Sequence, residues 1–369
     1  MMDRAALQRF GVIGVGTIGA VLVAFILGGV LLWTTGHNAF EVYRQMFSYG
    51  TEPQQLLDAA KRSGPLIMSA CAVAVGFKMN LFNIGVEGQF RVALLLAAVA
   101  GAAVKLPGPL HVAFIFVVAM AAGAAYAGIA ALLKVWRGVN EVIATIMLNA
   151  IALGLTGWLF QSFFKSTKLD SSGRPSLDVR TAVLPESAWL GNVFSGSAGK
   201  LSWYFVFALV VAFVVWLVVF RSTFGFQLRS SGLNPVAART AGIDSKKMVV
   251  RAMLFSGALA GLVGMQSLMV DEHSYRPGLG TGLGFVGIAV ALLGRNHPGG
   301  IVLAGLLFGF LQASSGILQL QEVPKSIVDI IQGIVVLTVV IVNEAVSRWY
   351  EKRTQRGTSK ALDRGEALV

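Results

Sequence analysis

The chain has 369 residues and a mass of 39.0 kDa; 55% of its residues are apolar, only 13% are charged, and its mean hydropathy is +0.71. Soluble globular chains carry about 25% charged residues, so this composition excludes a water-soluble enzyme of this size. The formal net charge is +12. Lys and Arg nevertheless lie between apolar runs rather than in one basic tract, which indicates membrane orientation and not nucleic-acid binding. The single cysteine, Cys71, excludes an intrachain disulfide.

Apolar runs long enough to cross a bilayer recur along the chain and predict about ten transmembrane helices. We expect them at 11–35, 64–79, 84–104, 108–133, 139–164, 201–220, 249–271, 281–295, 299–320 and 325–346. The predicted fold class is therefore all-α, a polytopic membrane helix bundle with interrupted helices. Residues 1–346 form its transmembrane domain, and residues 347–369 form a charged cytoplasmic tail of disordered composition.

The distribution of basic residues predicts the orientation of this bundle. With the N-terminus inside, most Lys and Arg fall in cytoplasmic segments, above all 221–251 and 346–369. The long outer segments are then 36–63 and 165–200. The positive-inside rule therefore places both termini in the cytoplasm.

A polar interruption separates the second and third predicted spans. Asn83, Glu87 and Gln89 lie there between two apolar runs, with Phe82 beside them and too few residues for an ordinary loop. Non-helical backbone at membrane depth is stable only against protein or a water-filled cavity, and interrupted helices of this kind often build substrate sites in transporters. The alternative is a cytoplasmic turn with Glu87 in bulk water.

The fifth predicted span begins with a polar stripe. Glu141, Thr145 and Asn149 recur at four-residue spacing and share one helix face. Lipid would penalise this face, so it should point into the bundle. The stripe predicts either the lining of a pathway for a polar solute or hydrogen-bonded contacts between helices.

The cytoplasmic segment 221–251 contains a short predicted helix, Pro235–Ala241. Asn234 suits its N-cap, Pro235 its first position and Gly242 the position just past its end. The residues expected on its surface are Ala237, Ala238, Ala241 and Arg239. Such a low-relief helix could fit the groove of a partner protein; the alternative is anchoring on anionic lipid head groups.

Several motifs of enzymes are absent or lack their context. The GxGxxG patterns at Gly14–Gly19 and Gly282–Gly287 lie in apolar runs without the strand and acidic residue of a dinucleotide site. The sequence has no phosphate-binding GxxxxGK[ST] loop, no HExxH and no Cys–His cluster, so we expect no bound metal and no ATP site in this chain.

Together these stretches resemble a known family, the bacterial ABC importer permeases of the branched-chain amino acid/ribose/nucleoside group, and within it the nucleoside-type (simple-sugar) branch. The similarity runs from about residue 64 to 345. The stretches that carry it are Phe82–Gln89, Glu141–Asn149, Gly225–Arg229, Gly232–Ala238, Gly287–Gly294, Val323-Pro324 and Val328–Ile331. The chain departs from the family pattern at Val286, where relatives often carry an acidic residue, and at Arg295, where they carry a glycine.

The resemblance implies a non-enzymatic permease subunit in a bacterial inner membrane. Its implied partners are a second homologous permease, cytoplasmic ABC ATPases that bind the ATP and Mg, an extracytoplasmic solute-binding protein and membrane lipid. The residues implied near the solute pathway are Phe82, Asn83, Glu87, Gln89, Thr145, Asn149 and Phe285. The residues implied in coupling to the ATPase are Asn234, Pro235, Ala237, Ala238, Arg239 and Gly242.

The expected activity is ATP-driven import of a nucleoside-like solute by alternating access, with the ring of the solute stacked on Phe82 or Phe285. Riboflavin, a simple sugar or an amino acid are alternative solutes. Two alternatives come from other classes. An ion-coupled secondary transporter would need a relay of buried carboxylates, for which only Glu87 and Glu141 qualify. A membrane-embedded enzyme would need a cluster of catalytic residues, which the sequence does not contain.

Overall fold

The computed structural model describes residues 19, 22–166, 179–197, 199–321, 327, 329–335, 337–338 and 341–342. The chain divides into two compact units, Met1–Tyr49 with Ser314–Val369, and Gly50–Ala313. The predicted tail 347–369 lies outside the described residues, as do 325–326, 328, 336, 339–340 and 343–346 of the predicted span 325–346.

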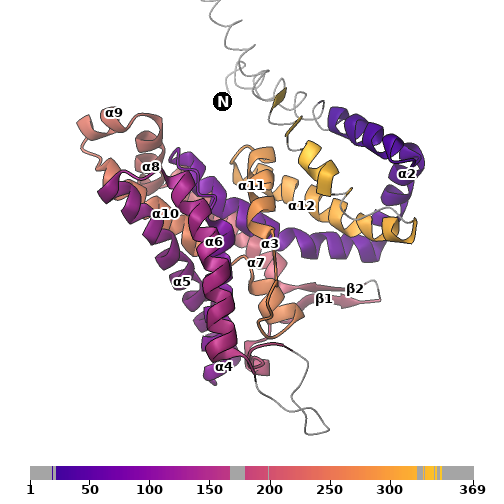
Figure 1. Cartoon of the computed structure of the whole chain (residues 1–369), viewed down its shortest axis with the longest axis horizontal. Coiled ribbons are helices and arrows are strands. Elements are labelled where there is room, and N and C mark those ends of the chain that lie inside the picture. Colours follow the sequence, from indigo (N-terminus) through magenta and orange to yellow (C-terminus); the bar gives the residue numbers. More distant parts are fainter. Residues whose placement is uncertain are drawn as a thin grey trace, which may run out of the picture. The chain divides into compact units, whose positions relative to one another are not determined.

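The larger unit, Gly50–Ala313, is a group of helices with one hairpin (Figure 1). Its α-helices are α3 (Pro53–Lys78), α4 (Val86–Ala103), α5 (Gly108–Arg137), α6 (Glu141–Leu159), α7 (Trp203–Trp216), α8 (Thr223–Leu233), α9 (Pro235–Thr240), α10 (Ser245–Gly261), α11 (Leu283–Leu293) and α12 (Pro298–Ser314). Its shorter elements are the π-helical turns η1 (Phe160–Phe164), η3 (Leu217–Arg221) and η4 (Ser267–Asp271), the 3-10 turn η2 (Glu186–Ala188), and strands β1 (Asn192–Gly196) and β2 (Gly199–Ser202).

Helix α3 is the buried centre of this unit. Every residue from Ser63 to Gly76 is buried, and the helix packs against α7, α10 and α11. A helix that is apolar on all sides is stable only when other elements enclose it. A helix covers nearly all of the predicted span 64–79, but it begins earlier, at Pro53, and its crossing of the membrane stays a prediction.

The smaller unit contains a sharp bend near the start of the described chain. Leu22–Thr34 and α2 (Ala39–Gly50) are inclined by 119°, and η5 (Ser315–Gln321) belongs to the same unit. Asn38 Oδ1 accepts a hydrogen bond from the backbone N–H of Phe40 and stabilises the start of α2. The segment 36–63, expected on the outer side, contains α2 and the first turns of α3, and its side of the membrane stays a prediction.

Among the described residues, five helices are long and apolar enough to cross a membrane, or six if the bent pair is one span. They are Val86–Ala103, Gly108–Arg137, Glu141–Phe164, Trp203–Arg221 and Pro298–Leu318. The other predicted spans are not among these five; α11, for example, has 11 residues, about 16 Å against a hydrocarbon core of about 30 Å. A multi-pass membrane protein is confirmed, whereas about ten spans and the terminal orientation stay predictions.

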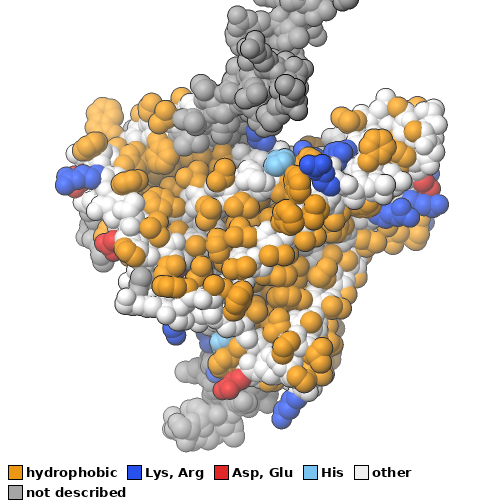
Figure 2. Space-filling model, turned by 180° about the vertical axis from the view of Figure 1, so that it is seen from behind, with side chains coloured by type: hydrophobic (Ala, Val, Ile, Leu, Met, Phe, Trp, Pro, Cys, Tyr) orange, Lys and Arg blue, Asp and Glu red, His pale blue; other side chains and the backbone are white. Residues whose placement is uncertain are grey.

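Figure 2 shows that hydrophobic side chains cover most of one face of the molecule, with Lys and Arg mainly toward its margins. This distribution is the reverse of a soluble protein and fits a surface that meets lipid or other membrane helices.

The only β-strands among the described residues form one hairpin, β1 and β2, between η2 and α7. Strands β1 and β2 pair antiparallel, with Asn192 opposite Ser202 and Gly196 opposite Gly199 at the turn. Gly199 has φ +130°, which favours glycine in this tight connection. The all-α expectation is therefore correct for the bundle but missed this exposed hairpin.

Glycines bring α5 and α10 into backbone contact. A Cβ added at Gly261 would lie 2.0 Å from the carbonyl oxygen of Ala119, and one at Gly123 would lie 2.3 Å from that of Gly257. Small residues four apart allow such close approach of helices in membranes. The α5–α10 pair therefore has no room for even one methyl group at these positions.

We predict that Gly261→Ala lowers the thermal stability of the detergent-purified chain, because the added methyl must push α5 and α10 apart, at a cost of about 1–3 kcal/mol. The matched control is Gly154→Ala on α6, where nothing lies within 4 Å of the added atom. Equal melting temperatures for the two variants would contradict the close packing.

Candidate functional site

The break between α3 and α4 is held together by hydrogen bonds from buried side chains. Asn83 donates from Nδ2 to Gln89 Oε1 at 3.0 Å and to Ser256 Oγ at 2.8 Å, and its Oδ1 accepts from Gln89 Nε2 at 2.8 Å and from the N–H of Gly85 at 3.1 Å. Ser256 in turn donates to the carbonyl of Ala72 in α3. Asn83 and Gln89 thus satisfy the non-helical backbone at this depth and tie α3, α4 and α10 together.

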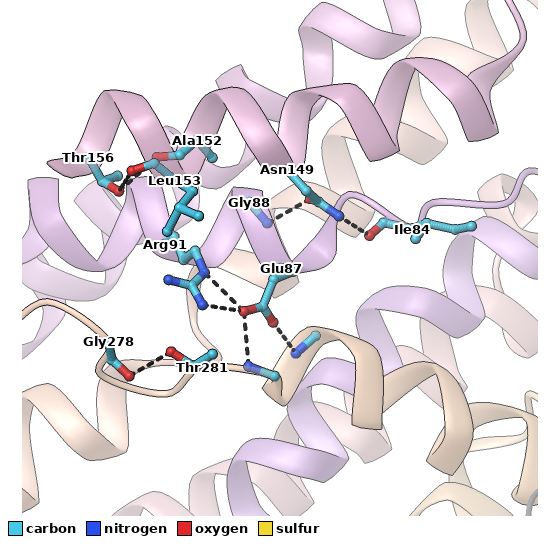
Figure 3. Close-up of polar contacts among 12 residues, drawn as sticks. Ile84, Glu87, Gly88, Arg91, Asn149, Ala152, Leu153, Thr156, Gly278 and Thr281 are labelled. Atoms are coloured by element: carbon cyan, nitrogen blue, oxygen red, sulfur yellow. Dashed lines mark hydrogen bonds and ion pairs between the residues drawn. The ribbon is translucent and has the colours of Figure 1, made fainter. Parts of the chain in front are cut away.

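Asn149 of α6 also hydrogen-bonds the backbone of this break. Its Oδ1 accepts from the N–H of Gly88 at 2.8 Å, and its Nδ2 donates to the carbonyl of Ile84 at 2.9 Å (Figure 3). A Cβ at Gly88 would lie 2.8 Å from Asn149 Oδ1, so only glycine admits this contact. One amide side chain therefore fixes the first turn of α4 against α6.

The carboxylate of Glu87 lies at the junction of two helix N-termini. Its Oε1 accepts from Arg91 Nε at 2.9 Å, from Arg91 Nη2 at 2.8 Å and from the N–H of Gly282 at 3.0 Å, while its Oε2 accepts from the N–H of Gly284 at 2.9 Å (Figure 3). Glu87 is 4% exposed. The alternative that it lies in bulk water is wrong, because the side chain is buried and both carboxylate oxygens accept hydrogen bonds from protein N–H groups.

This arrangement explains how a charge is tolerated inside the bundle. A carboxylate is stabilised by the partial positive charge of a helix N-terminus, and Glu87 is near two of them, α4 and α11. Arg91 supplies the full countercharge at i+4. A Cβ at Gly284 would lie 2.5 Å from the backbone N of Glu87, so α11 can approach this carboxylate only through a glycine.

The polar stripe of α6 is engaged within the protein as well. Thr145 donates to the carbonyl of Glu141 at 2.7 Å, and Glu141 pairs with Lys134 Nζ at 2.5 Å. Phe82 and Phe285 differ from these residues: their side chains are 47% and 51% exposed. The structure therefore gives hydrogen-bonding roles to Asn83, Glu87, Gln89, Thr145 and Asn149, and leaves the two aromatic rings accessible. Their part in a solute pathway stays a prediction.

Sequence reasoning missed Arg91, Ser256 and the backbone of Gly282 and Gly284. The i, i+4 spacing of Glu87 and Arg91 on a helix was a signal that could have identified the ion pair. Ser256 and the two glycines follow more than 160 residues later and carry no local signal.

The predicted cytoplasmic helix is present as α9. Asn234 Oδ1 accepts from the N–H groups of Val236 at 3.0 Å and Ala237 at 3.1 Å, Pro235 occupies the first position, and Gly242 has φ +79° just past the end. Ala237 and Arg239 are exposed. One expectation is wrong: Ala238 is 3% exposed and faces inward, where the N–H of Ile243 bonds its carbonyl and closes the turn into α10.

Within the described part of the chain, no group of three or more His, Cys, Asp or Glu side chains could hold a metal ion. The polar side chains of the site are acceptors and donors for backbone and for each other rather than a ligand set.

Broken helices whose ends are joined by buried polar side chains, in a chain with several apolar spans, define a multi-pass membrane transport protein. The chain belongs to the family described as "branched-chain amino acid transport system / permease component", whose model matches residues 55–340. Members are permease subunits, so the chain is a component of a membrane transporter and not an enzyme. The family expected from the sequence motifs is confirmed.

Three curated relatives resemble the chain over most of their length. It is 34% identical to the guanosine ABC transporter permease protein NupP of Bacillus subtilis over 324 residues, which are 87% of this chain and 91% of the relative. It is 29% identical to the nucleoside ABC transporter permease protein NupB of Lactococcus lactis, with 87% and 89% covered. It is 32% identical to the glucose ABC transporter permease protein TsgB13 of Haloferax volcanii, with 86% and 84% covered.

We predict that Glu87→Gln destabilises the chain strongly, because it leaves the Arg91 guanidinium buried without a countercharge; removing one partner of a buried pair costs about 3–5 kcal/mol. The measurement is thermal unfolding of the purified chain. Glu41→Gln is the matched control, because Glu41 pairs with Arg44 at 3.6 Å on an exposed surface and should change stability little. A Glu87→Gln protein as stable as the control would contradict the role of the junction.

Proposed function

We propose that this chain is a permease subunit of an ATP-driven importer that carries a nucleoside into the cytoplasm by alternating access. The observation that carries the proposal is its similarity, along nearly its whole length, to a guanosine and a nucleoside permease. We propose a bacterial inner membrane, both termini in the cytoplasm, and residues 1–346 as the permease domain. ATP and Mg would bind to a separate ATPase, and an extracytoplasmic binding protein would deliver the solute.

The form of α11 supports a pathway or a second permease subunit beside it. Phe285 is exposed, and Val286 and Ala289 are partly exposed. The helix is too short to span a bilayer, and non-helical backbone flanks both of its ends. Such backbone is not stable against lipid. The exposed face of α11 therefore needs protein or a water-filled cavity against it, which a homologous permease with a shared pathway would supply.

The residues beside this face suit a neutral, polar solute with an aromatic ring. Phe285 offers a face on which a base could stack. Arg91 uses Nε and Nη2 on Glu87, and Figure 3 shows its third nitrogen directed away from that carboxylate. This Nη1 would donate a hydrogen bond to a carbonyl or hydroxyl oxygen of the solute. Opposed helix N-termini around Glu87 would form the part of the bundle that changes between outward-open and inward-open states.

A simple sugar is the second candidate solute, because the Haloferax relative is a glucose permease of similar identity. A sugar shares the hydroxyl groups of a nucleoside but lacks its aromatic base. The two candidates therefore differ in whether stacking on Phe285 matters.

The solute is tested by uptake into proteoliposomes that contain the complex purified from native membranes through a tag on this chain, with its binding protein outside. We expect ATP-dependent uptake of radiolabelled guanosine that excess adenosine or cytidine reduces and excess glucose leaves unchanged. Competition by glucose alone would favour the sugar. Uptake that follows an ion gradient without ATP would contradict the importer.

The coupling role is tested at the exposed face of α9. Ala237→Glu should keep the fold, since Ala237 is exposed, but should reduce ATPase attachment and uptake by about tenfold or more, because a carboxylate at an apolar contact costs at least about 1.4 kcal/mol. The control is Lys200→Glu on the exposed hairpin, which should leave attachment unchanged. Ala238→Glu is not an informative variant, because Ala238 is buried and its substitution would disturb the fold itself.

A further inference from the structure

A cavity lies where the end of α3 meets α8, apart from the junction at Glu87. It has a volume of about 490 Å³ and is lined by Phe77, Lys78, Asn80, Arg229, Gly232 and Leu233. A Cβ at Gly232 would lie 2.7 Å from the carbonyl oxygen of Lys78, so α8 and the end of α3 are in backbone contact beside it. The wall that carries the two cations is therefore firmly placed.

Two cations of this cavity share one aromatic ring. Lys78 Nζ and Arg229 Cζ each lie 5.4 Å from the centroid of Phe220, and Arg229 also donates to the carbonyl of Val219. Neither Lys78 nor Arg229 forms an ion pair with a carboxylate in the described part of the chain. Two half-buried cations at close range repel each other unless an anion lies between them.

The turn after α11 adds positive charge at the same place. The His297 ring lies 5.1 Å from the Phe220 centroid, and Arg295 is near enough to act on the charge of Lys78. Burial first, and the positive charge of Lys78 second, lower the pKa of His297. Three elements, α3, α8 and the turn after α11, thus bring basic side chains together around Phe220 of η3.

The surroundings of these cations are apolar and lie at the end of a membrane span. Phe220 belongs to η3, in the last turn of the span Trp203–Arg221. Leu233, on the cavity wall, is 88% exposed, and Phe82, edge-on to Phe77 at 5.0 Å, is 47% exposed. Aromatic and basic side chains together at the end of a span are typical of the boundary between hydrocarbon and head groups.

We propose that this cavity binds the phosphate group of an anionic phospholipid, with the phosphate between Lys78 and Arg229 and the acyl chains along Phe82 and Leu233. The apolar rim favours a lipid over free phosphate, because an inorganic anion gains nothing from Phe82 or Leu233. It also favours a lipid over an acidic side chain of the ATPase, for which the exposed face of α9 is the proposed contact. Basic pockets at the cytoplasmic end of membrane helices bind anionic head groups in this way. The site is independent of which solute is carried.

The experiment compares the melting temperature of the full chain in nanodiscs of phosphatidylglycerol and of phosphatidylcholine, with lipid retention read by native mass spectrometry. We expect phosphatidylglycerol to raise the melting temperature and to be retained by the wild type. Lys78→Gln and Arg229→Gln should each weaken retention about fivefold, which corresponds to about 1 kcal/mol per removed charge. Lys247→Gln, which removes an exposed charge outside the cavity, should retain the lipid like the wild type.

Three outcomes would overturn the proposal. One is equal retention of phosphatidylglycerol by the wild type and the Lys78→Gln, Arg229→Gln double variant. Another is an equal stabilisation of the chain in phosphatidylcholine by inorganic phosphate alone, which would show a free-anion site. The last is a loss of ATPase attachment in phosphatidylcholine on Lys78→Gln, which would assign the cations to the protein partner. Because Arg229 also bonds backbone, Lys78→Gln alone decides the result if Arg229→Gln fails to fold.

Discussion

The packing at the centre of this permease depends on one buried carboxylate. Glu87 receives hydrogen bonds from Arg91 of its own helix and from Gly282 and Gly284, which lie 195 and 197 residues later in the chain. It thereby joins the first turn of α4 to the start of α11 and satisfies two N–H groups there that have no partner within their own helix. The glycines opposite it are required by the same contact, because a side chain at Gly284 would occupy the space of the Glu87 backbone.

Local features of the structure could be predicted from the sequence because their causes are local. The start and end of α9 follow from Asn234, Pro235 and Gly242, each acting within four residues of itself, and the structure has all three in the expected places. The break before α4 follows from polar residues between apolar runs. The family followed from the order of such stretches along the chain, and the match of residues 55–340 confirms it.

Features that depend on distant residues could not be predicted in the same way. The inward position of Ala238 arises from how α9 closes onto α10, which composition does not encode. Asn149 was expected to point into the bundle, and Asn83 and Gln89 were expected at a polar break, but their partners Ser256 and the backbone of Gly88 and Ile84 depend on how helices pack. The hairpin Asn192–Ser202 was missed because short, glycine-containing strands have no strong alternation of apolar residues.

The glycine contacts between α5 and α10 have a mechanical consequence. Helices whose backbones touch must separate before they can slide or tilt against each other. We therefore expect α5 and α10 to move together as one rigid body. Helix α9 connects to α10 through a turn of four residues, 241–244, in which Gly242 N–H and Ile243 N–H bond back to α9. We therefore expect a force applied at α9 to move α10 together with α5, and bending to occur beyond Gly261, where regular helix gives way to the turn 262–264.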